Sequence, residues 1–254
     1  MPPYSESELV EHQQTLYASK NLTRRWLHCT RRDWIFDALR RVTNQGRSDR
    51  ALEVGPGSGI YLPVLAGLYR SVTASDVEES YLTNAGRLIA TCPNIHPVID
   101  NITRTKLPKA GFDLILCTEV VEHIADSTSA ISEMHHLLRD GGTLLLSTPQ
   151  RWSPLELTAK IAFAPGIIDL VRWVYKESIL ETGHINLMSE KQVTRQLEQA
   201  GFHIDERFKS GMYLPLIAEF MGSTGLGLEQ WLESRICNGP MDWLLWTQYY
   251  IAKK

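Results

Sequence analysis

Short apolar runs alternate with segments of helical periodicity through the middle of the chain. The predicted strands cover residues 51–54, 71–76, 96–99, 112–118 and 143–147, and the predicted helices between them cover 60–69, 77–91, 120–125 and 127–138. Strands that alternate with helices at this pace form a parallel sheet with helices on both faces, because each crossover is right-handed. The pattern therefore predicts a doubly wound α/β sheet.

The flanks have a different rhythm. Residues 6–43 carry apolar side chains at helical spacing, and residues 150–183 suggest one or two apolar helices interrupted at Pro154 and Pro165. A capped helix over 189–200 and strands over 202–208 and 244–251 follow, whereas 211–240 is rich in Gly and Pro and is predicted to be irregular. We predict a single domain over 1–254, made of an N-terminal helical cap (1–49), a core (50–149), an inserted helical lid (150–188) and the C-terminal part of the sheet (189–254).

Composition narrows the class of protein. Of the 254 residues, 43% are hydrophobic and 22% are charged, with a formal net charge of −3. This balance is that of a globular protein and argues against a disordered chain, a fibrous repeat or a strongly basic nucleic-acid binder. Lys20 to Arg41 is locally basic, which we interpret as a solvated helix face. Arg24, Arg25, Arg31 and Arg32 remain candidates for binding a carboxylate.

Cysteine and tryptophan usage adds two expectations. The four cysteines show no zinc spacing, the N-terminus lacks the pattern of a signal peptide, and no apolar run reaches the ~18 residues of a spanning helix. We therefore expect a cytoplasmic protein with reduced thiols. All seven Trp residues lie outside 51–149, so we expect the flanks to supply the flat apolar surfaces of a substrate site.

A glycine-rich loop follows the first predicted strand. It reads Glu53-Val54-Gly55-Pro56-Gly57-Ser58-Gly59 and leads into a predicted helix. Glycines allow a sharp turn and a close approach of backbone to ligand, and a helix N-terminus presents free N–H groups. The third glycine comes two residues after the second, not three, and an acidic residue precedes the loop. Both features argue against a nicotinamide oxidoreductase, which is one alternative.

Acidic residues also end the next two strands. Asp76 ends the second strand, and Asp100 ends the third and is followed by Asn101. Carboxyl ends of parallel strands meet at the ligand-binding edge of such a sheet. A carboxylate at Asp76 can accept both hydroxyls of a ribose, and the pair Asp100–Asn101 can recognise an adenine edge.

Taken together, these motifs resemble those of class I S-adenosylmethionine-dependent methyltransferases. The runs EVGPGSG, ASD, VIDN, FDLILCTEVVEH and LLRDGGTLLLSTPQ carry the resemblance over 50–149, and GHINLMSEKQVTRQLEQAGF extends it over 183–202. The similarity is strongest to small-molecule enzymes such as ubiquinone-biosynthesis O-methyltransferases, although Pro56 stands where many relatives have Cys or Ala.

The resemblance implies a Rossmann-like sheet of seven strands, mostly parallel with an antiparallel last strand, and S-adenosyl-L-methionine as cofactor, with S-adenosyl-L-homocysteine as product. The implied cofactor contacts are Glu53, Gly55, Gly57 and Gly59 to the methionine end, Asp76 to the ribose, Val77 to the adenine face, Asp100 and Asn101 to the adenine edge, and the Thr118 backbone with Glu119 near the sulfonium.

The run E-x-x-E-H forms a second constellation. Glu119, Glu122 and His123 would share one face if the turn is helical, and His184 follows later. Two carboxylates and two imidazoles suit Mg²⁺, Mn²⁺ or Zn²⁺, which would polarise a substrate hydroxyl. This pattern resembles metal-dependent O-methyltransferases, including small-RNA 2′-O-methyltransferases. The other interpretation has no metal: Glu119 assists the cofactor, Glu122 and His123 pair structurally, and His184 or His123 acts as general base.

The expected acceptor is a small apolar or aromatic molecule, methylated on oxygen in small-molecule biosynthesis. The apolar segment 150–183 is expected to form a lid, with peripheral membrane contact permitted by the resemblance, in a monomer or homodimer. The alternatives are RNA 2′-O-methylation, N- or C-methylation of a small molecule, and a non-catalytic cofactor-binding protein. RNA binding is disfavoured because the chain is slightly acidic.

Overall fold

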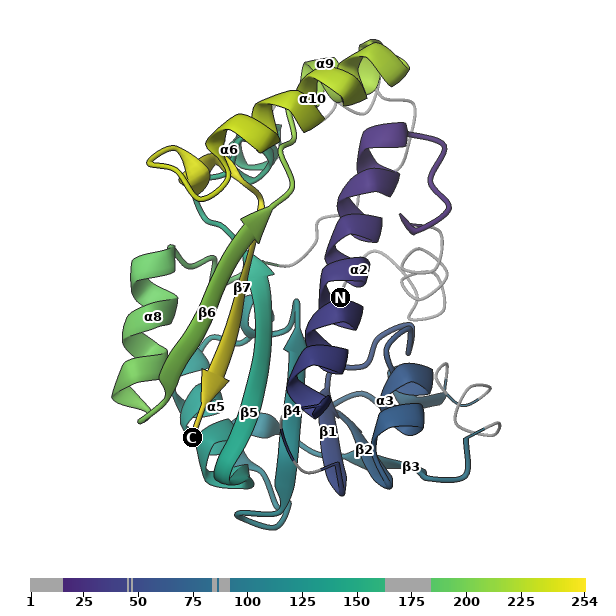
Figure 1. Cartoon of the computed structure of the whole chain (residues 1–254), viewed down its shortest axis with the longest axis vertical. Coiled ribbons are helices and arrows are strands. Elements are labelled where there is room, and N and C mark those ends of the chain that lie inside the picture. The colour runs from purple at the N-terminus through teal and green to yellow at the C-terminus, as the bar shows by residue number, and fades with distance from the viewer. Residues whose placement is uncertain (1–15, 45, 47, 84–85, 87–91, 163–183) are drawn as a thin grey trace.

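The computed structural model describes residues 16–44, 46, 48–83, 86, 92–162 and 184–254 (Figure 1). A seven-stranded sheet in the order β3-β2-β1-β4-β5-β7-β6 forms its centre. The strands are β1 (Arg50–Val54), β2 (Ser71–Asp76), β3 (Ile95–Ile99), β4 (Phe112–Thr118), β5 (Leu138–Pro149), β6 (His203–Ser210) and β7 (Thr247–Lys253). Strands β1 to β5 pair in parallel, and β7 runs antiparallel to both β5 and β6. The predicted doubly wound sheet with an antiparallel last strand is therefore confirmed.

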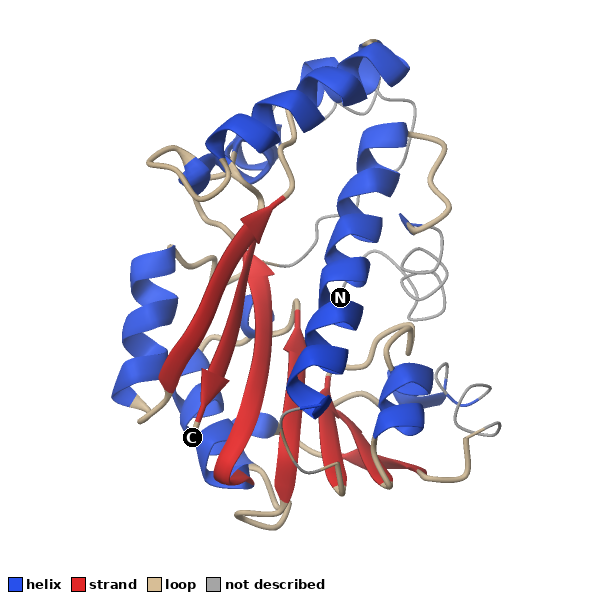
Figure 2. Ribbon diagram, in the orientation of Figure 1, coloured by secondary structure: helices blue, strands red, loops and turns tan. Residues whose placement is uncertain are grey.

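Helices cover both faces of the sheet (Figure 2). They are α2 (Leu22–Asn44), α3 (Leu62–Leu68), α5 (Ser127–Leu137), α6 (Pro154–Ala162), α8 (Glu190–Gln199), α9 (Pro215–Phe220) and α10 (Gly222–Ile236), with 3₁₀ turns η1 (Ile102–Arg104), η2 (Val121–His123) and η3 (Asp242–Leu244). α2 and α3 lie on one face, and α5 and α8 lie on the other. α6, α9 and α10 gather beyond the upper end of β5 (Figure 1). Within the described ranges, no helix combines the length and apolar character needed to cross a membrane.

Alternating side chains of the strands build two separate cores. Leu52 and Val54 point toward α5 and α8, whereas Ala51 points toward α2 and α3. A third, smaller cluster joins α2, α9 and the segment before β7 through Leu27, Tyr213, Ala218 and Trp246. Successive residues of a strand face opposite sides of the sheet, which explains the near-continuous apolar runs of the central strands.

The prediction of irregular structure over 211–240 is wrong, because α9 and α10 occupy 215–236. Gly225 shows the reason. A Cβ placed there would lie 2.8 Å from the Ile217 carbonyl oxygen, so the two helices pack through a glycine. Tertiary contact of this kind overrides the low helix propensity of glycine.

Three boundaries also differ from prediction. The strand predicted over 143–147 is β5, which already begins at Leu138 and includes residues 140–142. The expected helix over 120–125 is only the single turn η2, and the expected strand over 244–251 is displaced to β7 because η3 occupies 242–244. Parts of three expected elements lie outside the described residues: the start of the N-terminal cap up to residue 15, residues 84–85 and 87–91 of the helix over 77–91, and residues 163–183 of the lid.

Candidate functional site

The glycine-rich loop connects β1 to α3 at the carboxyl edge of the sheet. Gly55, Gly57 and Gly59 have φ of 67°, 50° and 73°, in the left-handed region that other residues rarely adopt. A Cβ at Gly55 would lie 2.5 Å from Cγ2 of Val120. The loop therefore requires glycine for both backbone conformation and space.

Glu53 lies in β1 just before this loop and is buried, with 1% of its surface exposed. Neither carboxylate oxygen has a hydrogen-bond partner among the described residues. Burial raises the pKa of Glu53 to about 8. A buried, unpartnered carboxyl group is costly unless a ligand supplies donors. Glu53 thus fits a ligand whose end is cationic or carries several N–H donors. The amino-acid end of S-adenosylmethionine has this character.

Asp76 and Asp100 lie side by side at the ends of β2 and β3. The Asp100 N–H donates to the Asp76 carbonyl oxygen at 2.9 Å. Oδ1 of Asp76 accepts the Glu78 N–H at 3.1 Å, so this carboxylate does cap the following turn. Burial raises the pKa of Asp76, and the N–H groups of Glu78 and Val77 oppose that rise. Asp100 keeps one buried oxygen without a partner among the described residues.

The neighbouring predicted contacts are placed at the same edge. Val77 has an apolar side chain that is 56% exposed. Such an exposed apolar surface suits the face of the adenine ring that was predicted to lie there. The Asn101 side chain is occupied, because it accepts the Thr103 N–H at 3.0 Å and caps η1. These bonds use the side-chain oxygen and not the backbone N–H, which is the group predicted to contact the adenine. Thr118 ends β4 beside Ser147 of β5.

Glu119 follows β4 in a left-handed conformation with φ of 55°. Its Oε1 accepts the Ser147 hydroxyl at 2.9 Å, and its Oε2 forms an ion pair with Arg31 of α2 at 2.6 Å. Burial by itself lowers the pKa of Arg31, but Glu119 and nearby tyrosines raise it above its ordinary value, so Arg31 stays charged. Of the candidate arginines, Arg31 is therefore the one that the fold brings to this edge. Arg24 pairs with Glu219 and Arg32 with Asp33.

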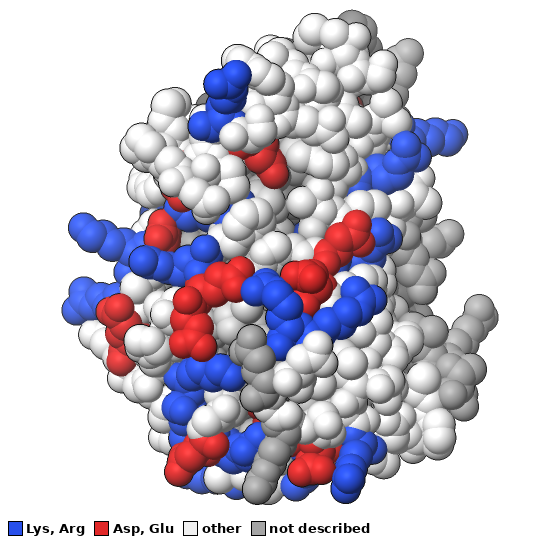
Figure 3. All heavy atoms as spheres, viewed as in Figure 1, with Lys and Arg blue, Asp and Glu red and all other residues white. Residues whose placement is uncertain are grey.

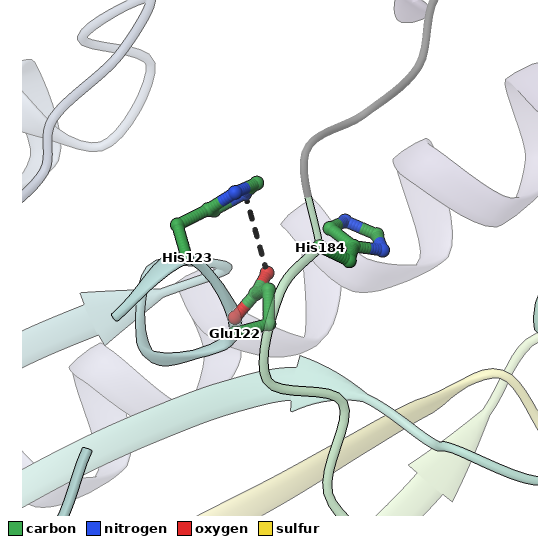
Figure 4. A group of neighbouring side chains, drawn as sticks. All are labelled: Glu122, His123 and His184. Atoms are coloured by element: carbon green, nitrogen blue, oxygen red, sulfur yellow. Dashed lines mark ion pairs between the residues drawn. The ribbon is translucent and has the colours of Figure 1, made fainter. Parts of the chain in front are cut away.

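Glu122, His123 and His184 form a cluster in which one ligand atom from each lies within 4.8 Å of the others (Figure 4). Oε1 of Glu122 is 4.0 Å from Nε2 of His123, and the two imidazole centroids are 5.1 Å apart. The Ile185 and Asn186 N–H groups donate to the Glu122 carbonyl oxygen at 3.1 and 2.9 Å. These backbone bonds bring His184 beside η2 across 61 residues of sequence.

Glu122 is the buried member of this cluster. Its Oε2 accepts the Thr148 hydroxyl at 3.0 Å, and its Oε1 has no hydrogen-bond partner in the described part of the chain. Burial, and secondarily the charge of Glu119, hold the pKa of Glu122 well above its ordinary value. Oε1 of Glu122 is therefore available to bind a donor or a cation.

The prediction that Glu119 completes a four-residue metal set is not supported by the structure. Glu119 precedes η2 in a left-handed turn, so it does not share a helical face with Glu122 and His123, and its carboxylate is directed to Arg31. The candidate ligand set is reduced to the three residues of the cluster.

Sequence reasoning missed Glu156, which lies beside His184, and its hydrogen bond with Trp246. Oε2 of Glu156 on α6 is 3.4 Å from Nδ1 of His184, and Nε1–H of Trp246 donates to Oε1 of Glu156 at 3.0 Å. One signal was present in the sequence, because Glu156 is the only acidic residue between 150 and 168. Trp246 lies outside the Trp-free middle of the chain, where apolar walls were expected.

Residues 24–207 match a family model described as a methyltransferase domain. A probable S-adenosylmethionine-dependent methyltransferase of Mycolicibacterium smegmatis is 27% identical over 194 residues, which cover 75% of this chain and 66% of that protein. A ubiquinone biosynthesis O-methyltransferase of Dinoroseobacter shibae is 31% identical over 154 residues, covering 60% of this chain and 59% of that protein. The chain thus matches about two-thirds or less of the length of these relatives.

The fold is also that of solved structures. The N-methyltransferase NodS of Bradyrhizobium japonicum, in complex with S-adenosyl-L-homocysteine, superposes with a TM-score of 0.59 at 17% identity, covering 98% of this chain and 96% of NodS. At this identity the likeness concerns the fold alone.

Proposed function

Because this chain belongs to the class I S-adenosylmethionine-dependent methyltransferase family, we propose that it transfers the methyl group of S-adenosylmethionine to an oxygen atom of a small apolar or aromatic molecule. The carrying observation is Glu53, a buried carboxyl group with two unpartnered oxygens beside a left-handed glycine loop. The similarity to a ubiquinone biosynthesis O-methyltransferase supports an oxygen acceptor.

The bound cofactor supplies an already activated sulfonium methyl, so the protein needs no covalent intermediate. The residues of the chain hold and orient the two molecules. Glu53 and the glycine loop receive the methionine end, Asp76 the ribose, and Val77, Asp100 and Asn101 the adenine. Fixing both reactants in one geometry accounts for much of the rate enhancement of such transfers.

The acceptor is proposed to lie between the Glu122–His123–His184 cluster and the side chains around Trp246. Leu27, Tyr213 and Trp246 are buried apolar or aromatic neighbours on this side. His184, with its ring beside His123, is the proposed base that takes the hydroxyl proton at Nε2. On the face in Figure 3, acidic and basic side chains are interspersed and the region of α9 and α10 carries few charges. On this face, the arrangement of charges favours a small molecule over RNA, which would need a continuous basic surface.

Cofactor binding is the first prediction. Calorimetry with S-adenosylmethionine and S-adenosylhomocysteine should show micromolar or tighter binding, and Asp76→Ala should weaken it about 10–100-fold, because a charge-assisted hydrogen bond contributes about 1.5–3 kcal/mol. Asp205→Ala, on the exposed side of β6, is the control and should bind like the unmodified protein. Binding of neither compound would refute the proposal.

We also propose that Glu122, His123 and His184 hold a divalent cation, a second candidate favoured by their three ligand atoms lying within 4.8 Å. A cation there would polarise the acceptor oxygen. Titration of the protein–S-adenosylhomocysteine complex with Mn²⁺, followed by electron paramagnetic resonance, should show one bound ion. Glu122→Gln should weaken its binding at least ~10-fold, since a charged ligand is lost.

The matched control for the metal prediction is Glu133→Gln, because Glu133 also faces a histidine, His136, at 3.9 Å but lies away from this edge. It should leave Mn²⁺ binding unchanged. Absence of Mn²⁺ binding, together with full activity in chelator, would reject the metal and leave the acid–base role of His184.

A further inference from the structure

Glu156 is a buried carboxylate whose two oxygens serve two different side chains. It lies on α6 and is 6% exposed. Oε1 accepts the indole N–H of Trp246 at 3.0 Å, and Oε2 lies 3.4 Å from Nδ1 of His184. The carboxylate therefore connects a residue of the sheet's last segment to the proposed base.

The indole that holds Glu156 is itself fixed in place. Trp246 packs with Leu27 and Tyr213, and the guanidinium of Arg31 lies 5.5 Å above its ring. Its backbone N–H donates to the Gly211 carbonyl oxygen at 2.9 Å. Because an indole N–H can only donate, Trp246 requires an acceptor at the Oε1 position and so fixes how the carboxylate of Glu156 is turned.

This geometry decides which nitrogen of His184 carries the proton. An ionised carboxylate can only accept hydrogen bonds, so a neutral imidazole beside it carries its proton on Nδ1. The lone pair is then on Nε2, the nitrogen proposed to take the acceptor's proton, and the same nitrogen is the one left for a cation. The backbone bonds of residues 185 and 186 to Glu122 hold the His184 side of this pair.

We infer that Glu156 is a positioning residue that sets the tautomer of His184. Helix α6, near the start of the predicted insertion 150–188, would thus orient the imidazole of a residue near the end of that insertion. The inference rests on the proposed function for the role of Nε2 as the atom that takes the acceptor's proton. The tautomer of His184 itself can be measured without turnover. Neither Glu156 nor Trp246 touches the reacting atoms in this scheme.

The experiment is nitrogen-15 NMR of the histidine rings in the full-length protein bound to S-adenosylhomocysteine, at about pH 8.5, which is about two units above the pKa of a free imidazole. His184→Asn assigns the resonances. The unmodified protein should show His184 protonated on Nδ1. In Glu156→Gln, Trp246 keeps the amide oxygen, so the amide NH₂ faces His184 and the proton should move to Nε2.

A double variant tests the role of Trp246. In Glu156→Gln with Trp246→Phe, the donor that holds the amide oxygen is gone, so the amide can turn its oxygen to His184 and the Nδ1–H tautomer should return. Glu229→Gln is the matched control, because Glu229 is a buried carboxylate whose oxygens accept from Thr23 and Leu214 and not from a histidine. It should leave the His184 signals unchanged.

The outcomes separate this inference from the proposed function. His184 protonated on Nε2 in the unmodified protein, or an unchanged tautomer in Glu156→Gln, overturns the inference whatever the activity. Calorimetry of Glu156→Gln should show unaltered S-adenosylhomocysteine binding, whereas lack of binding by the unmodified protein would overturn the proposed function. Once an acceptor is identified, Glu156→Gln should lower kcat about 10–100-fold with little change in KM.

Discussion

The ligand-free protein should lose folding stability as the pH rises, and Glu53→Gln should remove this loss. Burial raises the pKa of Glu53 from 4.5 to about 8 in the folded state. Between these two values the unfolded chain has ionised Glu53 and the folded chain has not, so stability falls as the pH rises through this window and levels off above it. At about 1.4 kcal/mol per pKa unit, the full difference is on the order of 4–5 kcal/mol.

The measurement is urea unfolding from about pH 5 to about pH 9, a range that spans the ionisation of Glu53. The unmodified protein should lose several kcal/mol relative to Glu53→Gln across it. The exposed Glu198→Gln is the control and should follow the unmodified protein. Parallel curves for Glu53→Gln and the unmodified protein would contradict the prediction. Binding of the cationic cofactor should also release a proton near neutral pH, seen as a buffer-dependent heat that Glu53→Gln abolishes.

Arg31→Met should destabilise the protein by about 3–5 kcal/mol, because it leaves the Glu119 carboxylate in a largely buried position without its counter-charge. The side chains of Arg31 and Glu119 are only 9% and 18% exposed, and their charged atoms are 2.6 Å apart. Loss of the guanidinium also removes the cation above Trp246. Chemical unfolding at neutral pH measures the effect.

A double-mutant cycle identifies the cause. Glu119→Gln removes the stranded charge, so Arg31→Met with Glu119→Gln should recover most of the loss. Arg32→Met is the control, since Arg32 pairs with Asp33, which is 62% exposed, and should cost at most ~1 kcal/mol. A loss below ~1 kcal/mol in Arg31→Met, or strict additivity in the cycle, would show that the unpaired charge of Glu119 is not the cause of the destabilisation.

The parallel strands and the shared edge of the proposed cofactor residues follow from local pattern. Parallel strands end at one edge, so the positions of Glu53, Asp76 and Asp100 at the ends of predicted strands are enough to assign them to the same edge. The glycines of the loop have the left-handed φ values that their spacing suggests. These features depend on consecutive residues, whose alternation and backbone freedom can be read directly.

The helix α10 escapes prediction because intrinsic propensity counts its glycines as helix breakers, and α9 is a short helix that begins at a proline. Gly225 is needed where the two helices touch, a contact that no local window contains. The prediction of Glu119 on a helical face fails for a similar reason, since its left-handed φ and its pairing with Arg31, 88 positions earlier, are properties of the packed structure.

The doubly wound sheet, the glycine loop and the row of acidic strand ends are predictable from the sequence, because periodicity and glycine conformation are encoded in neighbouring residues. The packing of distant segments sets which arginine reaches Glu119, which three residues form the cluster, and that Glu156 links Trp246 to His184. Glu156 and Trp246 are 90 positions apart, and the residues next to each of them do not predict that the two form a hydrogen bond. Such pairs arise from how whole helices and strands pack, where burial forces each polar group to find a partner.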